Sequence, residues 1–142
     1  MKMKDRITKS GVHIVNAIDG IGKPVEKGDK VWIKYTGYLE NGNIFDSSDN
    51  KDPLSMIVGQ GQVIKGWEEA IEGLKVGSKC TIIIPPELAY GNRSVGSMIP
   101  SNSILIFDIK VTKITQNYAE VVKKESEEKV KKVNREMYND ND

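Results

Sequence analysis

The stretch GWEEAIEGL, residues 66–74, predicts the one short helix around which the central part of the chain is organised. Its apolar residues recur at intervals of three and four, which places them on a single helical face: Trp67, Ala70, Ile71 and Leu74. The acidic residues between them point away from this face and favour the N-terminal half of a helix. An amphipathic helix of this kind packs its apolar face against another layer of structure.

The segments on both sides of this helix have the pattern of β-strands. Residues 30–39 alternate, so that Val31 and Ile33 share one face while Lys34 lies on the other. Residues 40–43 read Glu-Asn-Gly-Asn, a strong signal for a hairpin turn. Further strands are expected at residues 12–18, 44–48, 54–58, 79–84 and 103–114. We therefore predict an α+β fold with an antiparallel sheet of about five strands packed on the helix.

The two ends of the chain differ from this central part. Residues 1–10 are polar, and we expect them to be disordered or frayed, which leaves residues 11–114 as the folded domain. Residues 115–142 contain no glycine or proline, are dense in charge and space their few apolar residues roughly as a helix does. We expect a charged, solvated helical tail whose middle, residues 123–129, is entirely polar. A coiled-coil seam is an alternative, but too few heptads carry apolar a and d positions to expect it.

Composition excludes several classes of function. The chain has 21 Lys and Arg against 20 Asp and Glu, a net charge of +1, which gives no general attraction to nucleic acid or to an anionic membrane. No apolar run approaches the roughly 18 residues of a membrane span. The N-terminus lacks the apolar core of a signal peptide, so we expect a cytoplasmic protein.

The residues that could hold a metal or a cofactor do not form any recognisable binding motif. Cys80 is the only cysteine, which excludes an internal disulfide and a cysteine-based zinc site, and we expect it to be a buried core thiol. The glycines of residues 59–66 fit neither nucleotide-loop pattern. Asp46, Asp49 and Asp52 lack the glycine and glutamate of a calcium loop, so we expect no metal and no cofactor.

Six short segments stand in a characteristic order: Tyr35-Thr36-Gly37, Phe45-Asp46-Ser47-Ser48, VIKGWEEA (63–70), PPELAYG (85–91), Ile99-Pro100 and LIFD (105–108). Together they resemble the FKBP family of macrolide-binding peptidyl-prolyl cis–trans isomerases, also called immunophilins, over residues 10–114. The resemblance implies an FKBP-like half-barrel, a curved antiparallel sheet wrapped on one short helix. It also implies an enzyme that acts on X–Pro bonds of protein clients during folding, binds and is inhibited by tacrolimus and rapamycin, and is a monomer.

The resemblance also assigns roles to single residues. Trp67 would be the floor on which the proline ring rests, and Asp46 the acidic group at the rim. The Tyr90 hydroxyl and the Ile64 backbone N–H would donate to substrate carbonyls. The remaining ligand-binding residues would be apolar walls: Tyr35, Phe45, Met56, Val63, Ile64, Ile99 and Phe107. Five residues would act in catalysis: Asp46, Tyr90, Phe45, Trp67 and Phe107.

The physical chemistry of the reaction agrees with such a set. Rotation about a peptide bond is slow because resonance gives the C–N bond double-bond character, with a barrier of about 18–20 kcal/mol. The twisted amide separates less charge than the planar one, so a nonpolar pocket favours it. Taken singly, each aromatic residue could be core and Asp46 a turn cap. Two alternatives stay open: a module that binds proline segments with incidental turnover, and a tail that recruits a partner as an amphipathic helix.

Overall fold

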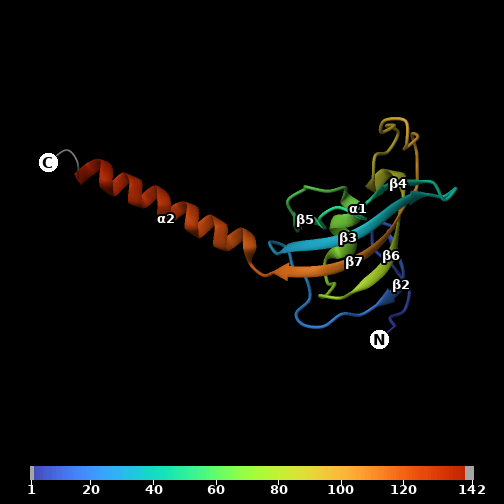
Figure 1. Cartoon of the computed structure of the whole chain (residues 1–142), viewed down its shortest axis with the longest axis horizontal. Helices are drawn as coiled ribbons and strands as arrows, with labels where there is room; N and C mark the ends of the chain where they lie inside the picture. The colour runs from blue at the N-terminus through green and yellow to red at the C-terminus, as the bar shows by residue number, and fades with distance from the viewer. Residues whose placement is uncertain (1, 140–142) are drawn as a thin grey trace.

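A computed structural model of the chain describes residues 2–139 (Figure 1). Along these residues the elements are β1 (Arg6–Ile7), β2 (His13–Ile18), β3 (Lys30–Leu39), β4 (Ile44–Ser47), β5 (Leu54–Ile57), α1 (Lys65–Ile71), β6 (Lys79–Ile84), a 3-10 turn (Pro86–Leu88), β7 (Leu105–Thr115) and α2 (Tyr118–Asn139). Neither α-helix is long and apolar enough within these residues to span a membrane.

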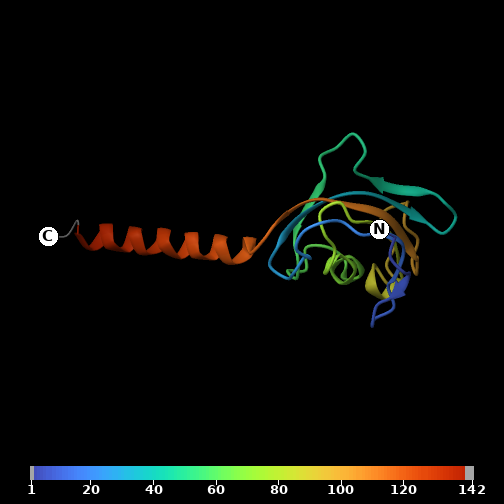
Figure 2. The same cartoon turned by 90° about the horizontal axis from the view of Figure 1, so that it is seen from below.

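The strands form one antiparallel sheet in the order β1-β2-β6-β7-β3-β4, with β5 paired to β3 as well. The central strand β3 pairs with β7 along its whole length, while β4 and β5 share its other edge. Figure 2 shows the sheet curving around α1. The predicted α+β half-barrel is confirmed, although the sheet has seven strands in the described residues rather than about five.

Helix α1 covers the concave face of the sheet and buries the apolar residues predicted for it, including Trp67, Ala70 and Ile71. The helix ends at Ile71 and not at Leu74 as expected, because Glu72 has a non-helical ψ of 127° and Gly73 follows with a positive φ of 93°. In that conformation the Gly73 N–H leaves the helical ladder and donates to the Val25 carbonyl at 2.8 Å. Leu74 is nevertheless buried, so the apolar face extends beyond the helical turns themselves.

The N-terminal segment differs from the prediction of a disordered or frayed residue range 1–10. Arg6 and Ile7 pair with β2 as strand β1, and the Thr8 N–H donates to the Val12 carbonyl at 2.8 Å. The Ser10 N–H also donates to a carboxylate oxygen of Glu69 on α1 at 3.2 Å. A two-residue strand is too short to produce a visible alternation, so the sequence offered no signal for this pairing.

The C-terminal tail is helical, as predicted, from Tyr118 to Asn139, and projects away from the sheet (Figure 1). Asp29, only 2 % exposed, fixes its start. One carboxylate oxygen of Asp29 accepts from the Glu26 N–H and the other from the Asn117 N–H, both at 2.9 Å. The Ala119 N–H donates to the Gly28 carbonyl at 2.9 Å, so two separate contacts hold the first turn of α2 to the domain. Residues 140–142 of the predicted tail lie outside the described residues.

The convex face of the sheet carries a row of exposed lysines. Lys34 on β3 and Lys79 on β6 both stand directly opposite Lys110 on β7. Within residues 2–139, none of these three lysines forms an ion pair. Trp32 lies on the same face, with the Lys113 ammonium 4.6 Å from its ring centroid. This tryptophan is therefore on the opposite side of the sheet from α1.

Candidate functional site

A cavity of about 220 Å³ opens between the concave face of the sheet and the start of α1. Its walls come from β3, β4, β5, β7, the loop before α1 and the long loop after β6. The residues that line it are Tyr35, Phe45, Asp46, Leu54, Gln62, Val63, Ile64, Trp67, Tyr90 and Phe107. The lining is predominantly apolar and aromatic, with few polar groups, which is typical of a small-molecule or peptide side-chain site.

Four aromatic rings form one connected cluster in this cavity. The Trp67 ring meets Tyr35 at 5.3 Å and Phe107 at 5.1 Å between centroids, both nearly perpendicular. Phe45 meets Phe107 at 5.5 Å and 88°. Edge-to-face contacts at these distances are the favoured geometry of aromatic pairs. Trp67 is 3 % exposed and therefore forms a deep floor, which its neighbours hold in one orientation.

Gly37 allows two of these rings to occupy their positions. It lies on β3, opposite Asp46 of β4 and Phe107 of β7. A Cβ atom at Gly37 would stand 2.7 Å from Phe107 Cε1 and 2.7 Å from Phe45 Cζ. Real Cβ atoms essentially never approach so closely, so the rings could not keep these positions beside any other residue type.

The rim of the cavity contains one tightly bonded polar pair. The Tyr35 hydroxyl donates to Asp46 Oδ2 at 2.6 Å, and the Ser47 N–H donates to Asp46 Oδ1 at 2.8 Å. Burial, together with the hydrogen bond and the charge of Asp46, raises the pKa of Tyr35 to about 12. The phenol thus stays protonated at neutral pH. Asp46 therefore both orients Tyr35 and accepts the N–H of the next residue along β4.

Two hydrogen-bond donors at the cavity have no partner within residues 2–139: the Tyr90 hydroxyl and the Ile64 backbone N–H. Tyr90 is 40 % exposed, so its ring stands at the cavity mouth. The Ile64 carbonyl, in contrast, accepts the Trp67 N–H at 3.0 Å. An apolar cavity with two unused donors can hold an apolar ring and bond to carbonyl oxygens beside it.

The structure brings most of the predicted site residues together. Eight of them line the cavity: Tyr35, Phe45, Asp46, Val63, Ile64, Trp67, Tyr90 and Phe107. Met56 and Ile99 do not, since both are buried in the core, Met56 to 1 % exposure. Leu54 takes the place expected for Met56. The strand register puts Leu54 opposite Ile33, whereas Met56 lies opposite Val31, two residues nearer the start of β3.

Leu54 and Gln62 are the cavity residues that the sequence prediction missed. Leu54 has the same alternation as Met56, so the pattern alone could not choose between them. Gln62 lies in a glycine-containing loop with no periodicity to indicate its direction. Within residues 2–139, no cluster of three His, Cys, Asp or Glu side chains is arranged to hold a metal ion.

Comparisons with known proteins point to one family. A family model described as FKBP-type peptidyl-prolyl cis-trans isomerase matches residues 22–112. The chain is 46 % identical over 97 residues to an FK506-binding protein of Neisseria meningitidis, covering 68 % of this chain and 89 % of that protein. It is 47 % identical over 106 residues to FK506-binding protein 1A of Neurospora crassa, covering 73 % and 88 %.

Two solved structures show the same arrangement. The crystal structure of AtFKBP13 superposes with a TM-score of 0.71 at 38 % identity, covering 80 % of this chain and all of that chain. The crystal structure of FkpA from Escherichia coli superposes with a TM-score of 0.71 at 34 % identity. That match covers 80 % of this chain and about half, 52 %, of FkpA.

Proposed function

Because the chain belongs to the FKBP-type peptidyl-prolyl cis–trans isomerases, we propose that its aromatic cavity binds the proline ring of protein clients and accelerates rotation of their X–Pro bonds. The observation that carries this proposal is an apolar, aromatic cavity that contains two hydrogen-bond donors without a partner among residues 2–139. The same surface is proposed to bind tacrolimus and rapamycin, which compete with clients for it.

The cavity suits rotation because it distinguishes the twisted amide from the planar one. Twisting the C–N bond removes amide resonance, so the carbonyl oxygen carries less negative charge and the nitrogen more electron density. The floor of Trp67 and the walls of Phe45 and Phe107 form a nonpolar environment, which favours the less polar twisted state. Each tenfold acceleration requires about 1.4 kcal/mol of tighter binding to the twisted state than to the planar one.

The two free donors define how the client chain lies in the cavity. We propose that the Ile64 N–H and the Tyr90 hydroxyl bond to carbonyl oxygens next to the proline ring. These bonds hold the chain on both sides of the rotating bond, which reduces the motion that must be restricted at each turnover. Rotation itself transfers no proton. Asp46 therefore acts in this scheme by keeping Tyr35 oriented as a cavity wall, through their 2.6 Å hydrogen bond.

The test measures cis–trans exchange of an X-Pro-Phe peptide by NMR or by a protease-coupled assay. Trp67→Leu and Phe45→Ala are expected to lower kcat/KM at least tenfold, because each removes part of the nonpolar surface around the proline ring. Trp32→Leu is the matched control, since Trp32 lies on the convex face and does not line the cavity. No acceleration by the wild type, or equal activity in all three variants, would refute the proposal.

Macrolide binding is tested by fluorescence in a Trp32→Phe background, where Trp67 is the sole tryptophan. The chain has two tryptophans, so this substitution removes the background signal from the convex face. Tacrolimus is expected to shift or quench Trp67 emission in a saturable manner and to inhibit exchange over the same concentration range. An unchanged spectrum together with undiminished activity at saturating drug would separate isomerase function from drug binding.

A further inference from the structure

The loop that connects β5 to α1 has an unusual set of hydrogen bonds. Residues 59–64 contribute Gln62, Val63 and Ile64 to the cavity lining. Within the described part of the chain, no backbone N–H of residues 59–64 donates to a backbone carbonyl. Residues 59–64 therefore lack the donated main-chain hydrogen bonds that normally hold a segment in one conformation, and side chains restrain them instead. One such bond runs from the Ile57 N–H to Gln62 Oε1 at 2.8 Å.

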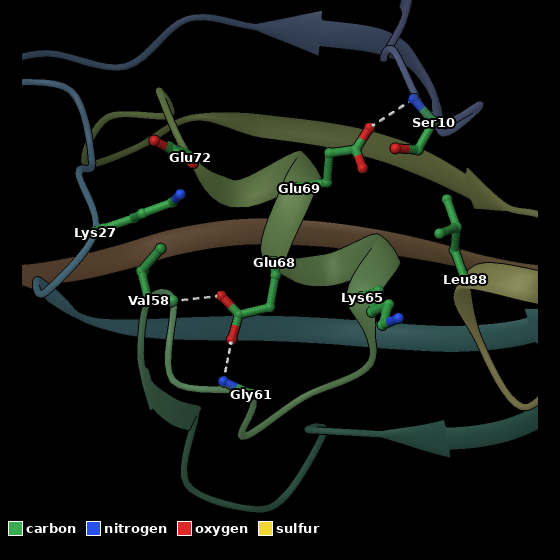
Figure 3. Close-up of a pocket in the computed structure, with 10 residues that line it drawn as sticks. Ser10, Lys27, Val58, Gly61, Lys65, Glu68, Glu69, Glu72 and Leu88 are labelled. Carbon is green, nitrogen blue, oxygen red and sulfur yellow. Dashed lines mark hydrogen bonds between the residues drawn. The ribbon is translucent and has the colours of Figure 1, made fainter.

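Val58, the first residue after β5, donates its N–H to the Asp29 carbonyl at 2.9 Å, and in residues 59–64 the only N–H groups with a partner among residues 2–139 both donate to Glu68. The Gly59 N–H donates to Glu68 Oε2 at 2.6 Å, and the Gly61 N–H donates to Glu68 Oε1 at 3.1 Å (Figure 3). Each carboxylate oxygen of Glu68 thus accepts one backbone N–H, and the two donors lie two residues apart in the loop. Hydrogen bonds to an ionised carboxylate are shorter and stronger than those between neutral groups.

Glu68 is well placed to transmit order from α1 to the cavity. It directly follows Trp67, the cavity floor, but its side chain lies on the outward face of the helix, in a separate depression (Figure 3). Its backbone N–H donates to the Ile64 carbonyl at 3.3 Å. Glu68 thereby contacts the loop near its start through the side chain and at its end through the backbone.

Resting on the function proposed above, we infer that Glu68 is a positioning residue for the proline cavity. Through Gly59 and Gly61 it holds the loop in the conformation that places Val63 and Ile64 as walls and leaves the Ile64 N–H free to donate. Glu68 does not line the cavity itself. Its effect on substrate is exerted through the loop, in contrast to Trp67, its neighbour in the sequence.

The neighbouring glutamate, Glu69, offers a matched control on the same helix. Its carboxylate accepts the Ser10 N–H at 3.2 Å, which ties the N-terminal segment to α1 and contacts no residue of the loop. Glu69→Ala therefore removes the same charge and the hydrogen bonds of Thr8 and Ser10 to the helix, and none of these contacts involves the cavity wall. If Glu68 served only the stability of the fold, the two alanine variants would behave alike.

The experiment compares wild type, E68A, E68Q and E69A. In E68A we expect KM for an X-Pro-Phe peptide to rise about five- to twentyfold with kcat within about threefold, because the loop walls contact the proline in both planar and twisted states. In E68Q one carbonyl oxygen is kept as acceptor, and we expect a rise of about three- to fivefold. E69A is expected to match the wild type within about twofold.

Two further measurements keep the test decisive. Hydrogen exchange at the Gly59 and Gly61 amides is expected to accelerate at least tenfold in E68A and not in E69A. The methyl NMR signals of Val63 and Ile64 are expected to shift and broaden in E68A. Unchanged KM, amide exchange and methyl signals in E68A would overturn the inference, and should E68A fail to fold, the same comparison is made with E68Q.

These readouts also separate the two proposals. If the wild type shows no isomerase activity, the proposed function fails, yet the amide exchange and methyl signals still decide whether Glu68 holds the loop. If the wild type is active and E68A has the KM and loop dynamics of E69A, the isomerase assignment stands and the role of Glu68 is rejected.

Discussion

Substituting Gly37 by alanine should displace the rings of Phe45 and Phe107, which are two walls of the cavity. The added Cβ would lie 2.7 Å from an atom of Phe107 and 2.7 and 2.9 Å from two atoms of Phe45. Carbon atoms in favourable contact are about 3.5–4.0 Å apart, so each ring must retreat by about 1 Å. Gly37 has the inward alternation of Ile33 and Tyr35 on β3, and the rings are therefore pushed towards the cavity.

The expected cost has two separate parts. Overpacking of this size destabilises a folded domain by about 1–3 kcal/mol, which urea denaturation of Gly37→Ala will measure. A displacement of about 1 Å at groups that enclose the reacting bond is expected to lower kcat/KM by about 10- to 100-fold. The NMR exchange assay on an X-Pro-Phe peptide measures this second part under conditions where the variant is fully folded.

Controls of similar stability distinguish a cavity effect from general loss of structure. Ile14 on β2 is buried and does not line the cavity. Ile14→Val and Ile14→Ala are expected to cost about 0.5–1.5 and 2–5 kcal/mol, which brackets the cost of Gly37→Ala. Activity of Gly37→Ala within twofold of these controls would refute the idea that Gly37 serves to place Phe45 and Phe107.

Three further predictions concern the rest of the fold. Burial raises the pKa of the Cys80 thiol from 9.0 to about 11. Native protein at pH 8 should therefore be alkylated at about a thousandth of the rate of a free thiolate. The free energy of unfolding should decline as pH rises from 9 to 11, because the unfolded chain loses this proton first. Asp29→Ala leaves two N–H groups without their charged acceptor and is expected to cost about 2–4 kcal/mol in urea denaturation, with Asp29→Asn costing less. Lys110→Thr removes a like charge from between two opposing lysines and is expected to stabilise the protein by about 0.2–1 kcal/mol, a gain that high salt reduces.

The elements with a long periodic signal could be predicted from the sequence. Residues 30–39 alternate because one face of that strand is buried, and the three-and-four spacing around Trp67 reflects one buried face of the helix. In the structure the apolar face of each element is buried as expected. The strand β1 could not be predicted, because two residues carry no period. The end of α1 was misplaced because Leu74 continues the apolar spacing while Gly73 has already left the helix.

The cavity residues that belong to the ordered set of segments were predicted well. The prediction was poorer where it had to decide whether a side chain reaches the cavity or is enclosed in the core. Leu54 and Met56 have the same alternation on β5, and only the register with β3 shows that Leu54 reaches the cavity while Met56 is enclosed in the core. The contact of Glu68 with Gly59 and Gly61 also depends on the path of a loop without periodicity. The opposition of lysines across β3, β7 and β6 likewise depends on strand register, which separate segments of sequence do not reveal.

The attachment of α2 has a practical consequence for experiments on surfaces. The helix has 22 residues, so at about 1.5 Å per residue it extends about 33 Å from the anchoring carboxylate of Asp29. A chain immobilised through a group attached at the end of α2 would therefore have a helix of this length between the support and the domain. Because α2 begins beside Asp29 and none of its described residues lines the cavity, clients and drugs should reach an immobilised cavity as readily as one in solution.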